Sequence, residues 1–192
     1  MAHDIVVIGV SAGGLEAVCA ILRDLPPAIG FALVVVQHRG KDSHALCEIL
    51  QRCAQMPVKE AADKDPIQIG HVYLAPADYH LFVDDGHVAL STDAPEFYSR
   101  PSIDITFESI ADYYGARAIG MVLTGANRDG ARGLRYLADR GGLPLLQDPA
   151  DAEVPVMPAE ALRSVPEAEI ITLASAARRL CELTDTPAVA QE

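Results

Sequence analysis

The chain has 192 residues, of which half are hydrophobic and 22% are charged, and its formal net charge is −12. This hydrophobic content excludes an intrinsically disordered chain, and the length suffices for one domain with a full core. The acidic balance disfavours a nucleic-acid partner and electrostatic attachment to a membrane, since both need a basic surface.

The apolar segments are of strand length, far below the roughly 20 residues that cross a bilayer. The N-terminal sequence, Met-Ala-His-Asp, lacks the basic region and the long apolar stretch of a signal peptide. We therefore expect a cytoplasmic protein without membrane insertion.

The four cysteines are Cys19, Cys47, Cys53 and Cys181, and no two of them form a Cys-x-x-Cys pair. The first three fall in helical patterns beside Leu and Ile, which favours small buried side chains in a reducing compartment. His44 lies near two of these cysteines, but a fourth ligand is missing, so we expect no metal site.

Strand and helix patterns alternate in the N-terminal third. Residues 5–9 form a β-branched run typical of a strand buried on both faces, and apolar residues then recur at helical spacing until Pro26-Pro27. The sequence further predicts a strand over 31–37, a helix containing Leu46 to Cys53 that Asp42 or Ser43 caps, and a weak strand over 57–61.

The middle of the chain has a different character. Short strand-like segments occupy residues 72–75, 79–83 and 88–90. The sequences between them, Pro76-Ala77-Asp78 and Asp84-Asp85-Gly86, are typical of turns. We expect antiparallel hairpin structure here, inserted between α/β units.

The alternation then resumes, with strands predicted over 118–123, 143–147 and 169–172 and helices over 103–114, 130–140, 158–164 and 174–183. The fold class is therefore α/β, a doubly wound and mainly parallel sheet in three α/β/α layers with the inserted hairpin region. We expect one domain over residues 1–192, with a core from about 4 to 183 and a frayed tail over 184–192.

Three polar residues follow three strong strands. Ser11 follows the first strand, His38 the second, and Asp129 the strand over 118–123. Because ligands bind at the carboxyl ends of parallel strands, we expect these side chains to meet at one edge of the sheet. A serine that attacks, a histidine that takes its proton and a carboxylate that orients the histidine form a nucleophilic site.

Structural roles remain open for each residue alone, because Ser11 and Asp129 can cap helices and a histidine at a strand end is often structural. Dinucleotide binding is disfavoured, since Ser11 replaces the middle glycine of that fingerprint and no acidic residue ends the second strand. Arg39 leaves a 2′-phosphate ligand open. We expect no cofactor.

Several blocks, in order from about residue 4 to 180, resemble the catalytic domain of the chemotaxis protein-glutamate methylesterase (CheB) family. They are residues 7–14, 34–38, Val72-Tyr73-Leu74-Ala75-Pro76 with His80-Leu81, Arg100-Pro101-Ser102-Ile103-Asp104, Leu123-Thr124-Gly125 with Asp129-Gly130-Ala131, Gln147-Asp148 and Met157-Pro158. The resemblance implies a hydrolase that removes methyl groups from glutamate methyl esters, and in many members deamidates glutamine, on chemoreceptor-type signalling proteins.

By this resemblance Ser11 is the nucleophile, His38 the base and Asp129 the orienting aspartate. Backbone N–H groups near Ala12 and Gly13 and at Ala126 are expected to hold the oxyanion. Arg100 is a candidate substrate-binding residue, and with Arg128 and Arg132 it is expected to attract acidic receptor helices; local pairing of these arginines is the alternative.

The sequence departs from the family pattern at three places. Ala12 stands where a Thr or Ser is usual, Gly125-Ala126-Asn127 replaces Gly-Met-Gly, and the stretch after His38 is not proline-rich. Typical members also carry an N-terminal phospho-receiver domain, whereas this chain begins at the catalytic domain, which favours a free-standing enzyme. A receptor methyltransferase and a sensor kinase are expected in the same pathway. A non-catalytic binding module and a small-molecule esterase remain as alternatives.

Overall fold

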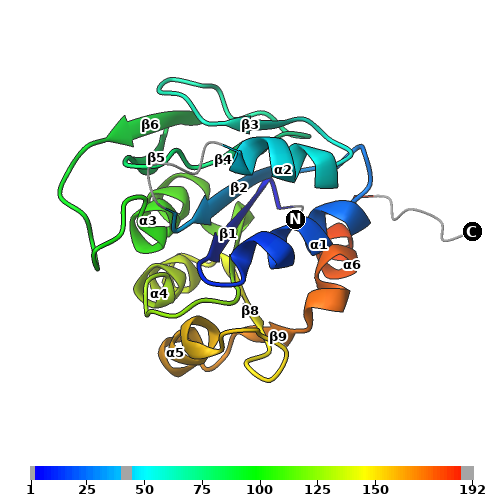
Figure 1. Cartoon of the computed structure of the whole chain (residues 1–192), viewed down its shortest axis with the longest axis vertical. Coiled ribbons are helices and arrows are strands. Elements are labelled where there is room, and N and C mark those ends of the chain that lie inside the picture. Colours follow the sequence, from blue (N-terminus) through cyan, green and yellow to red (C-terminus); the bar gives the residue numbers. More distant parts are fainter. Residues whose placement is uncertain (1–2, 40–44, 187–192) are drawn as a thin grey trace, which may run out of the picture.

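Seven parallel strands form one central sheet in the computed structural model, which describes residues 3–39 and 45–186 (Figure 1). Their spatial order is β3-β4-β2-β1-β7-β8-β9, so β1 lies between β2 and β7. The strands are β1 (Ile5–Val10), β2 (Ala32–Gln37), β3 (Val58–Glu60), β4 (Val72–Leu74), β7 (Ala118–Val122), β8 (Leu143–Gln147) and β9 (Glu169–Ile171). The predicted doubly wound α/β fold is confirmed.

The central strands are hydrophobic because both of their faces are covered. Every residue of β1 and β7 is buried, as are five of the six residues of β2. The register pairs Val10 of β1 with Gln37 of β2, and Gly9 of β1 with Val122 of β7. The three strands therefore end at the same edge of the sheet.

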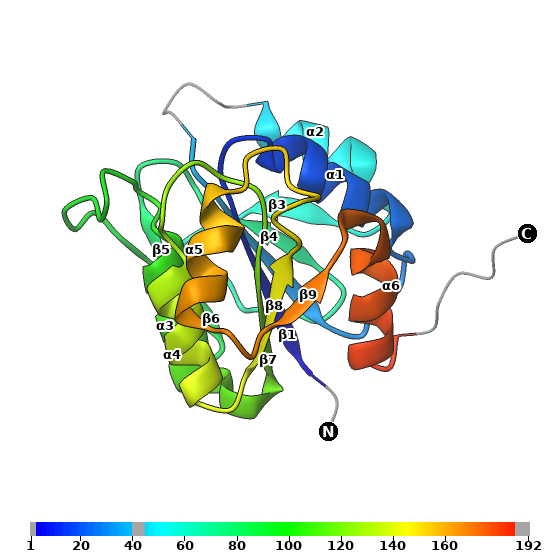
Figure 2. The same ribbon diagram turned by 90° about the horizontal axis from the view of Figure 1, so that it is seen from below.

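Helices cover the two faces of the sheet in separate groups (Figures 1 and 2). One face carries α1 (Gly14–Asp24), α2 (Leu46–Cys53) and α6 (Leu173–Leu183); the other carries α3 (Ile103–Tyr114), which η1 (Gly115–Arg117) joins to β7, with α4 (Ala131–Asp139) and α5 (Val156–Ser164). Each group closes its own hydrophobic core against the sheet, the first around Leu22 and Leu50 and the second around Phe107 and Leu134.

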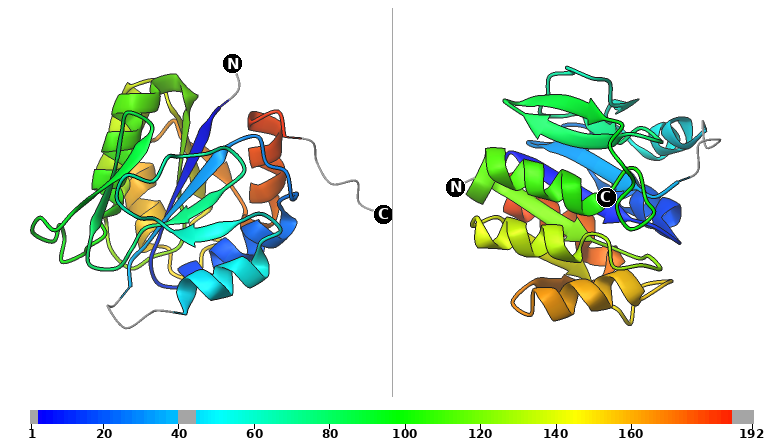
Figure 3. Two further views of the ribbon diagram at one scale, coloured as in Figure 1. Left: turned by 90° about the horizontal axis from the view of Figure 1, so that it is seen from above. Right: turned by 90° about the vertical axis from the view of Figure 1, so that its left-hand side faces the viewer.

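A two-stranded antiparallel sheet of β5 (His80–Asp84) and β6 (His87–Ser91) packs against α3 (Figure 3). The hydroxyl of Thr106 donates to the carbonyl of Leu81 at 2.9 Å, and the N–H of Val83 donates to Ser109 Oγ at 3.1 Å. This confirms a hairpin in the middle of the chain. The assignment of residues 72–75 to it is wrong, because β4 pairs in parallel with β2 and β3.

The predicted fraying of the C-terminal residues is wrong at its beginning. Thr184 and Thr186 are both buried, and the N–H of Gly30 donates to Thr186 Oγ1 at 2.9 Å. This bond ties the end of α6 to the loop before β2. The rest of the predicted tail, residues 187–192, and the predicted helix caps Asp42 and Ser43 lie outside the described residues.

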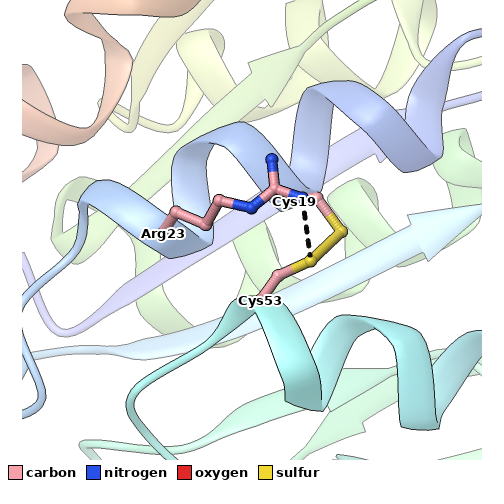
Figure 4. Close-up of a disulfide and its surroundings, with 3 residues drawn as sticks. All are labelled: Cys19, Arg23 and Cys53. Atoms are coloured by element: carbon pink, nitrogen blue, oxygen red, sulfur yellow. Dashed lines mark hydrogen bonds between the residues drawn. A yellow bond between two sulfur atoms is a disulfide. The ribbon is translucent and has the colours of Figure 1, made fainter.

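A disulfide joins Cys19 of α1 to Cys53 of α2, with a Cα–Cα distance of 5.3 Å (Figure 4). The interpretation of these two residues as separate, unpaired thiols is therefore wrong. The physical reason is tertiary, since α1 and α2 lie side by side on one face of the sheet and bring together residues 34 positions apart. Cys47 and Cys181 are free, and burial raises the pKa of both thiols.

Of the helices in residues 3–39 and 45–186, none combines the length and the apolar composition that a membrane crossing requires.

Candidate active site

The carboxyl ends of β1, β2 and β7, which are followed by Ser11, His38 and Asp129, lie side by side. Here the chain leaves β1 toward β2 on one side and leaves β7 toward β8 on the other, so its connections diverge. The N–H of His38 donates to the carbonyl of Val10 at 3.1 Å, and the N–H of Ser11 donates to the carbonyl of Thr124 at 3.0 Å. These bonds continue the pairing of β1 with its two neighbours just beyond the strands. In open α/β sheets such a switch point is where ligands bind.

His38 and Asp129 form a hydrogen-bonded pair across this edge. His38 Nε2 lies 2.7 Å from Asp129 Oδ2, and the carboxylate side chain is fully buried while the imidazole is 11% exposed. A carboxylate accepts hydrogen bonds only, so Nε2 carries the proton and the lone pair of the neutral ring is on Nδ1. The expectation that Asp129 holds the imidazole in one orientation therefore has its geometric basis.

Asp129 is itself fixed by the beginning of α3. Its carboxylate accepts hydrogen bonds from Ser102 Oγ at 3.0 Å and from the N–H groups of Ile103 and Asp104 at 2.7 and 2.9 Å. Burial by itself raises the pKa of Asp129, but the bonds from His38 and these N–H groups outweigh it and lower the pKa below its usual value. The carboxylate is therefore an ionised, immobile partner for His38.

A second buried carboxylate, Asp104, lies next to the first. Its Oδ1 accepts the N–H groups of Gly130 and Gly133 at 2.8 and 2.7 Å, at the beginning of α4. Its Oδ2 has no hydrogen-bond partner among the described residues, with Arg132 Nε 3.7 Å away. Burial, with a contribution from the charge of Asp129, raises the pKa of Asp104 to about 6.

Ser11 lies in the sharp turn between β1 and α1. The N–H of Gly14 donates back to the carbonyl of Ser11 at 2.9 Å, and Gly13 has a φ of 76°, a left-handed conformation that favours glycine. Gly125 faces this turn, and a Cβ there would lie 2.9 Å from Ser11 Cβ and 1.8 Å from Met157 Sδ. Only a glycine at position 125 lets the two loops approach this closely.

The hydroxyl of Ser11 makes no hydrogen bond with any residue in the described ranges, and Ser11 is partly exposed. The N–H groups of Ala12, Gly13 and Ala126 likewise find no acceptor there, and Ala12 and Ala126 are exposed. These N–H groups belong to the two loops that approach each other at Ser11 and Gly125, and donors without a partner in the described ranges can hold a developing negative charge.

Thr124 connects the two loops that carry these donors. Its hydroxyl donates to the carbonyl of Ala12 at 2.9 Å and accepts the N–H of Val154 at 2.9 Å, while its own N–H donates to Gln147 Oε1 at 3.0 Å. Thr124 and Gln147 thus hold the loops of the site together through hydrogen bonds. The resemblance contained both residues, but nothing in their spacing indicated these bonds.

Asn127 is the residue near His38 that sequence reasoning missed. Its Nδ2 lies 3.1 Å from His38 Nδ1, and its Oδ1 accepts the N–H of Asp129 at 3.1 Å. The only signal in the sequence was that Asn127 stands where the family pattern Gly-Met-Gly has its last glycine. The chain has no other asparagine.

A cavity of about 430 Å³ opens beside His38, lined by His38, Arg39, Asp78, Pro95, Tyr98, Ser99 and Arg100. Arg100 is held in its wall, with Nη2 2.6 Å from Asp78 Oδ1 and Nη1 2.7 Å from the carbonyl of Thr92. The arginine therefore stiffens the loop that borders the cavity, and its position beside the site is fixed.

The rim of this cavity is a tight turn from Glu96 to Ser99, whose two backbone groups exchange hydrogen bonds of 3.1 and 2.8 Å. Both central residues are left-handed, with φ of 47° at Phe97 and 64° at Tyr98. Such turns favour Asn and Gly, so two aromatic residues here are strained. Tyr98 is fully exposed at the tip.

The other two arginines differ from each other. Arg132 pairs with Glu96 at 2.6 Å and with Glu108 at 2.7 Å, so the alternative of local pairing is the correct one for this residue. Arg128 is exposed and makes no ion pair with a described residue, and its guanidinium lies 4.6 Å from the centre of the Phe97 ring. No group of three or more metal-ligating side chains occurs within the described ranges.

Comparisons with known proteins show which family this chain and its fold resemble. Residues 6–180 match the family model described as CheB methylesterase. A Leptospira interrogans protein named as a protein-glutamate methylesterase/protein-glutamine glutaminase is 41% identical over 175 residues, which cover 90% of this chain and 91% of that protein. The crystal structure of the Thermotoga maritima CheB methylesterase catalytic domain superposes with a TM-score of 0.89 at 30% identity, covering 95% of this chain and all of that one.

Other relatives are longer. A Pseudomonas aeruginosa protein-glutamate methylesterase/protein-glutamine glutaminase is 37% identical over 183 residues, which cover 94% of this chain but 55% of that protein. The chain thus spans about half the length of this relative.

Proposed function

The chain belongs to the CheB methylesterase family, and from that premise we propose that it hydrolyses glutamate methyl esters on chemoreceptor-type signalling proteins. The observation that carries the proposal is the His38–Asp129 pair, 2.7 Å apart at the same strand edge as Ser11. We propose that residues 4–183 act as one catalytic unit, with Ser11 as nucleophile, His38 as base and Asp129 as orienting carboxylate.

The first half of the reaction forms an acyl-enzyme. Ser11 Oγ attacks the ester carbonyl while its proton passes to His38 Nδ1, the ring nitrogen that Asp129 leaves available. The carbonyl oxygen becomes an oxyanion, which the N–H groups of Ala12, Gly13 and Ala126 receive. The carbonyl then re-forms, the bond to the methoxy oxygen breaks, and His38 returns the proton so that methanol leaves.

Water completes the reaction by the reverse use of the same groups. The oxygen of a water molecule attacks the acyl carbon while His38 Nδ1 takes a proton from that water. The bond between the acyl carbon and Ser11 Oγ then breaks. Ser11 regains its proton from His38, and the glutamic acid side chain that is released loses a proton to solvent to become the carboxylate. With a glutamine side chain the same steps release ammonia instead of methanol, which supports a glutaminase activity at the same site.

The rim of the cavity supports a protein as the substrate. Tyr98 offers an exposed aromatic ring and Arg128 an exposed cation beside the loop that carries Asp129. An acidic helix of a methyl-accepting receptor would find both contacts next to the reacting ester. A receptor methyltransferase and a sensor kinase are the further partners we propose, and the cytoplasm is the proposed compartment, because a kinase-linked pathway reads receptor methylation there.

Release of methanol from a receptor carrying labelled methyl groups tests the proposal. The wild-type protein and a Ser175→Ala control, changed at a half-buried serine of α6, should release methanol at equal rates, and Ser11→Ala should be at least about 1000-fold slower. Equal release by Ser11→Ala would refute the assigned nucleophile. Activity on short acyl esters without receptor demethylation would favour a small-molecule esterase, and inactivity on both would favour a binding module.

A further inference from the structure

The side-chain amide of Asn127 has only one orientation that satisfies its neighbours. The N–H of Asp129 can only donate, so the atom 3.1 Å from it must be the amide oxygen. The NH₂ group therefore points to His38 Nδ1, which lies 3.1 Å away. Because Asp129 accepts from Nε2, Nδ1 carries a lone pair and accepts this hydrogen bond.

The lone pair on Nδ1 is the one that a catalytic base needs. In the structure it is bound to Asn127, whereas the hydroxyl of Ser11 has no partner among residues 3–39 and 45–186. Imidazole has one lone pair on this nitrogen, so Asn127 and Ser11 cannot both donate strongly to it. Once Nδ1 has been protonated, the NH₂ group facing it becomes a repulsive neighbour.

We propose that Asn127 is a positioning residue that occupies the proton-accepting nitrogen of His38 in the resting enzyme and must yield it to Ser11 for reaction. This inference rests on the proposed function. It adds a resting state in which the base is held inactive by a neutral donor from the loop that also carries Asp129. Substrate contact with that loop would release the base.

Two substitutions separate this role from a purely structural one. Asn127→Ser keeps an oxygen for the N–H of Asp129 but is too short to reach Nδ1. Asn127→Asp keeps the same oxygen and replaces the donor by an acceptor, which favours a proton on Nδ1 and blocks the base. A loss of structure would slow both variants, whereas the proposed role moves them in opposite directions.

The reactivity of Ser11 with a fluorophosphonate probe measures the effect without a receptor. The bond from Ser11 Oγ to phosphorus forms, fluoride leaves, and His38 takes the serine proton. We expect labelling of Asn127→Ser to be roughly five-fold faster than that of the wild type, comparable to the release of one neutral hydrogen bond. Labelling of Asn127→Asp should be at least about ten-fold slower.

Asp148→Ser is the matched control, because Asp148 Oδ1 accepts the N–H of Ala150 at 2.8 Å in a similar turn without contacting a histidine. Its labelling rate should equal that of the wild type. Slowing of both Asn127 variants by similar factors, or no change in either, would overturn the proposal.

Nuclear magnetic resonance tests the contact even if the proposed esterase function fails. Since Asn127 is the only asparagine, protein labelled with ¹⁵N in asparagine and histidine has a single asparagine side-chain NH₂ signal. A scalar coupling across the hydrogen bond between Asn127 Nδ2 and His38 Nδ1 is expected in the wild type. Its absence, with Nδ1 carrying the proton, would contradict the proposal whatever the substrate is.

Discussion

Asp104 and Asp129 each bind the beginning of the helix that belongs to the other. Asp129, just before α4, accepts the N–H groups of Ile103 and Asp104 at the start of α3, and Asp104 accepts those of Gly130 and Gly133 around the start of α4. Both carboxylates thus gain the favourable field of a helix N-terminus. The reciprocal arrangement fixes the aspartate beside His38 from two helices.

Asp104→Asn should stabilise the protein at neutral pH but not in acid. Burial raises the pKa of Asp104 to about 6, above the ordinary value near 4, so its charged form destabilises the fold. The group's contribution to stability is present below about pH 4 and is lost as the pH rises through 6. Asparagine keeps an oxygen that accepts the N–H groups of Gly130 and Gly133. Because it does not ionise, it removes the loss of stability above pH 6.

We expect a gain of roughly 3 kcal/mol in the free energy of unfolding above pH 7, and little gain at pH 4, from urea titrations across this range. Asp139→Asn, at a carboxylate that is 60% exposed, is the control and should show no such trend. A gain for Asp104→Asn that is independent of pH would contradict the account.

Tyr98→Gly should raise stability and weaken substrate binding at once. Glycine relieves the left-handed strain at φ of 64°, worth about 1 kcal/mol. Loss of the exposed ring should increase KM for the receptor roughly five- to ten-fold with little change in kcat. Melting curves and demethylation kinetics measure the two effects.

Tyr113→Ala, at a tyrosine that is 41% exposed on α3, is the control and should leave KM unchanged. An unchanged KM for Tyr98→Gly would show that the turn from Glu96 to Ser99 does not contact the receptor.

Removing the disulfide should destabilise the fold without affecting chemistry. It closes a loop of 34 residues, which corresponds to about 3–4 kcal/mol. For a chain of this size the double variant Cys19→Ser/Cys53→Ser should melt roughly 10 °C lower, while Cys47→Ser should not. Denatured but unreduced protein should contain two reactive thiols, those of Cys47 and Cys181. Four reactive thiols would contradict the pairing.

The fold was predictable where one local signal dominated. The β-branched runs of β1 and β2 predict buried strands. Because the carboxyl ends of parallel strands lie at one edge of the sheet, the residues that follow the strands, Ser11, His38 and Asp129, could be predicted to lie together. The segment Val72–Leu74 was predicted as a strand, but its pairing was not, because three residues have no period and only their neighbours in the sheet decide the pairing.

The remaining features depend on contacts between distant segments. The bond from Asn127 to His38 spans 89 residues, and the one from Gly30 to Thr186 spans 156. The Cys19–Cys53 bridge requires two helices to pack side by side. No residue pattern within a single segment carries such information.

The rate and position of fluorophosphonate labelling test the central claim, that His38 and Asp129 activate Ser11. Peptide mapping of the wild type should find one adduct, on Ser11, and His38→Gln should slow its formation at least about 1000-fold while the protein remains folded. An adduct on another residue, or a rate unchanged in His38→Gln, would contradict the account.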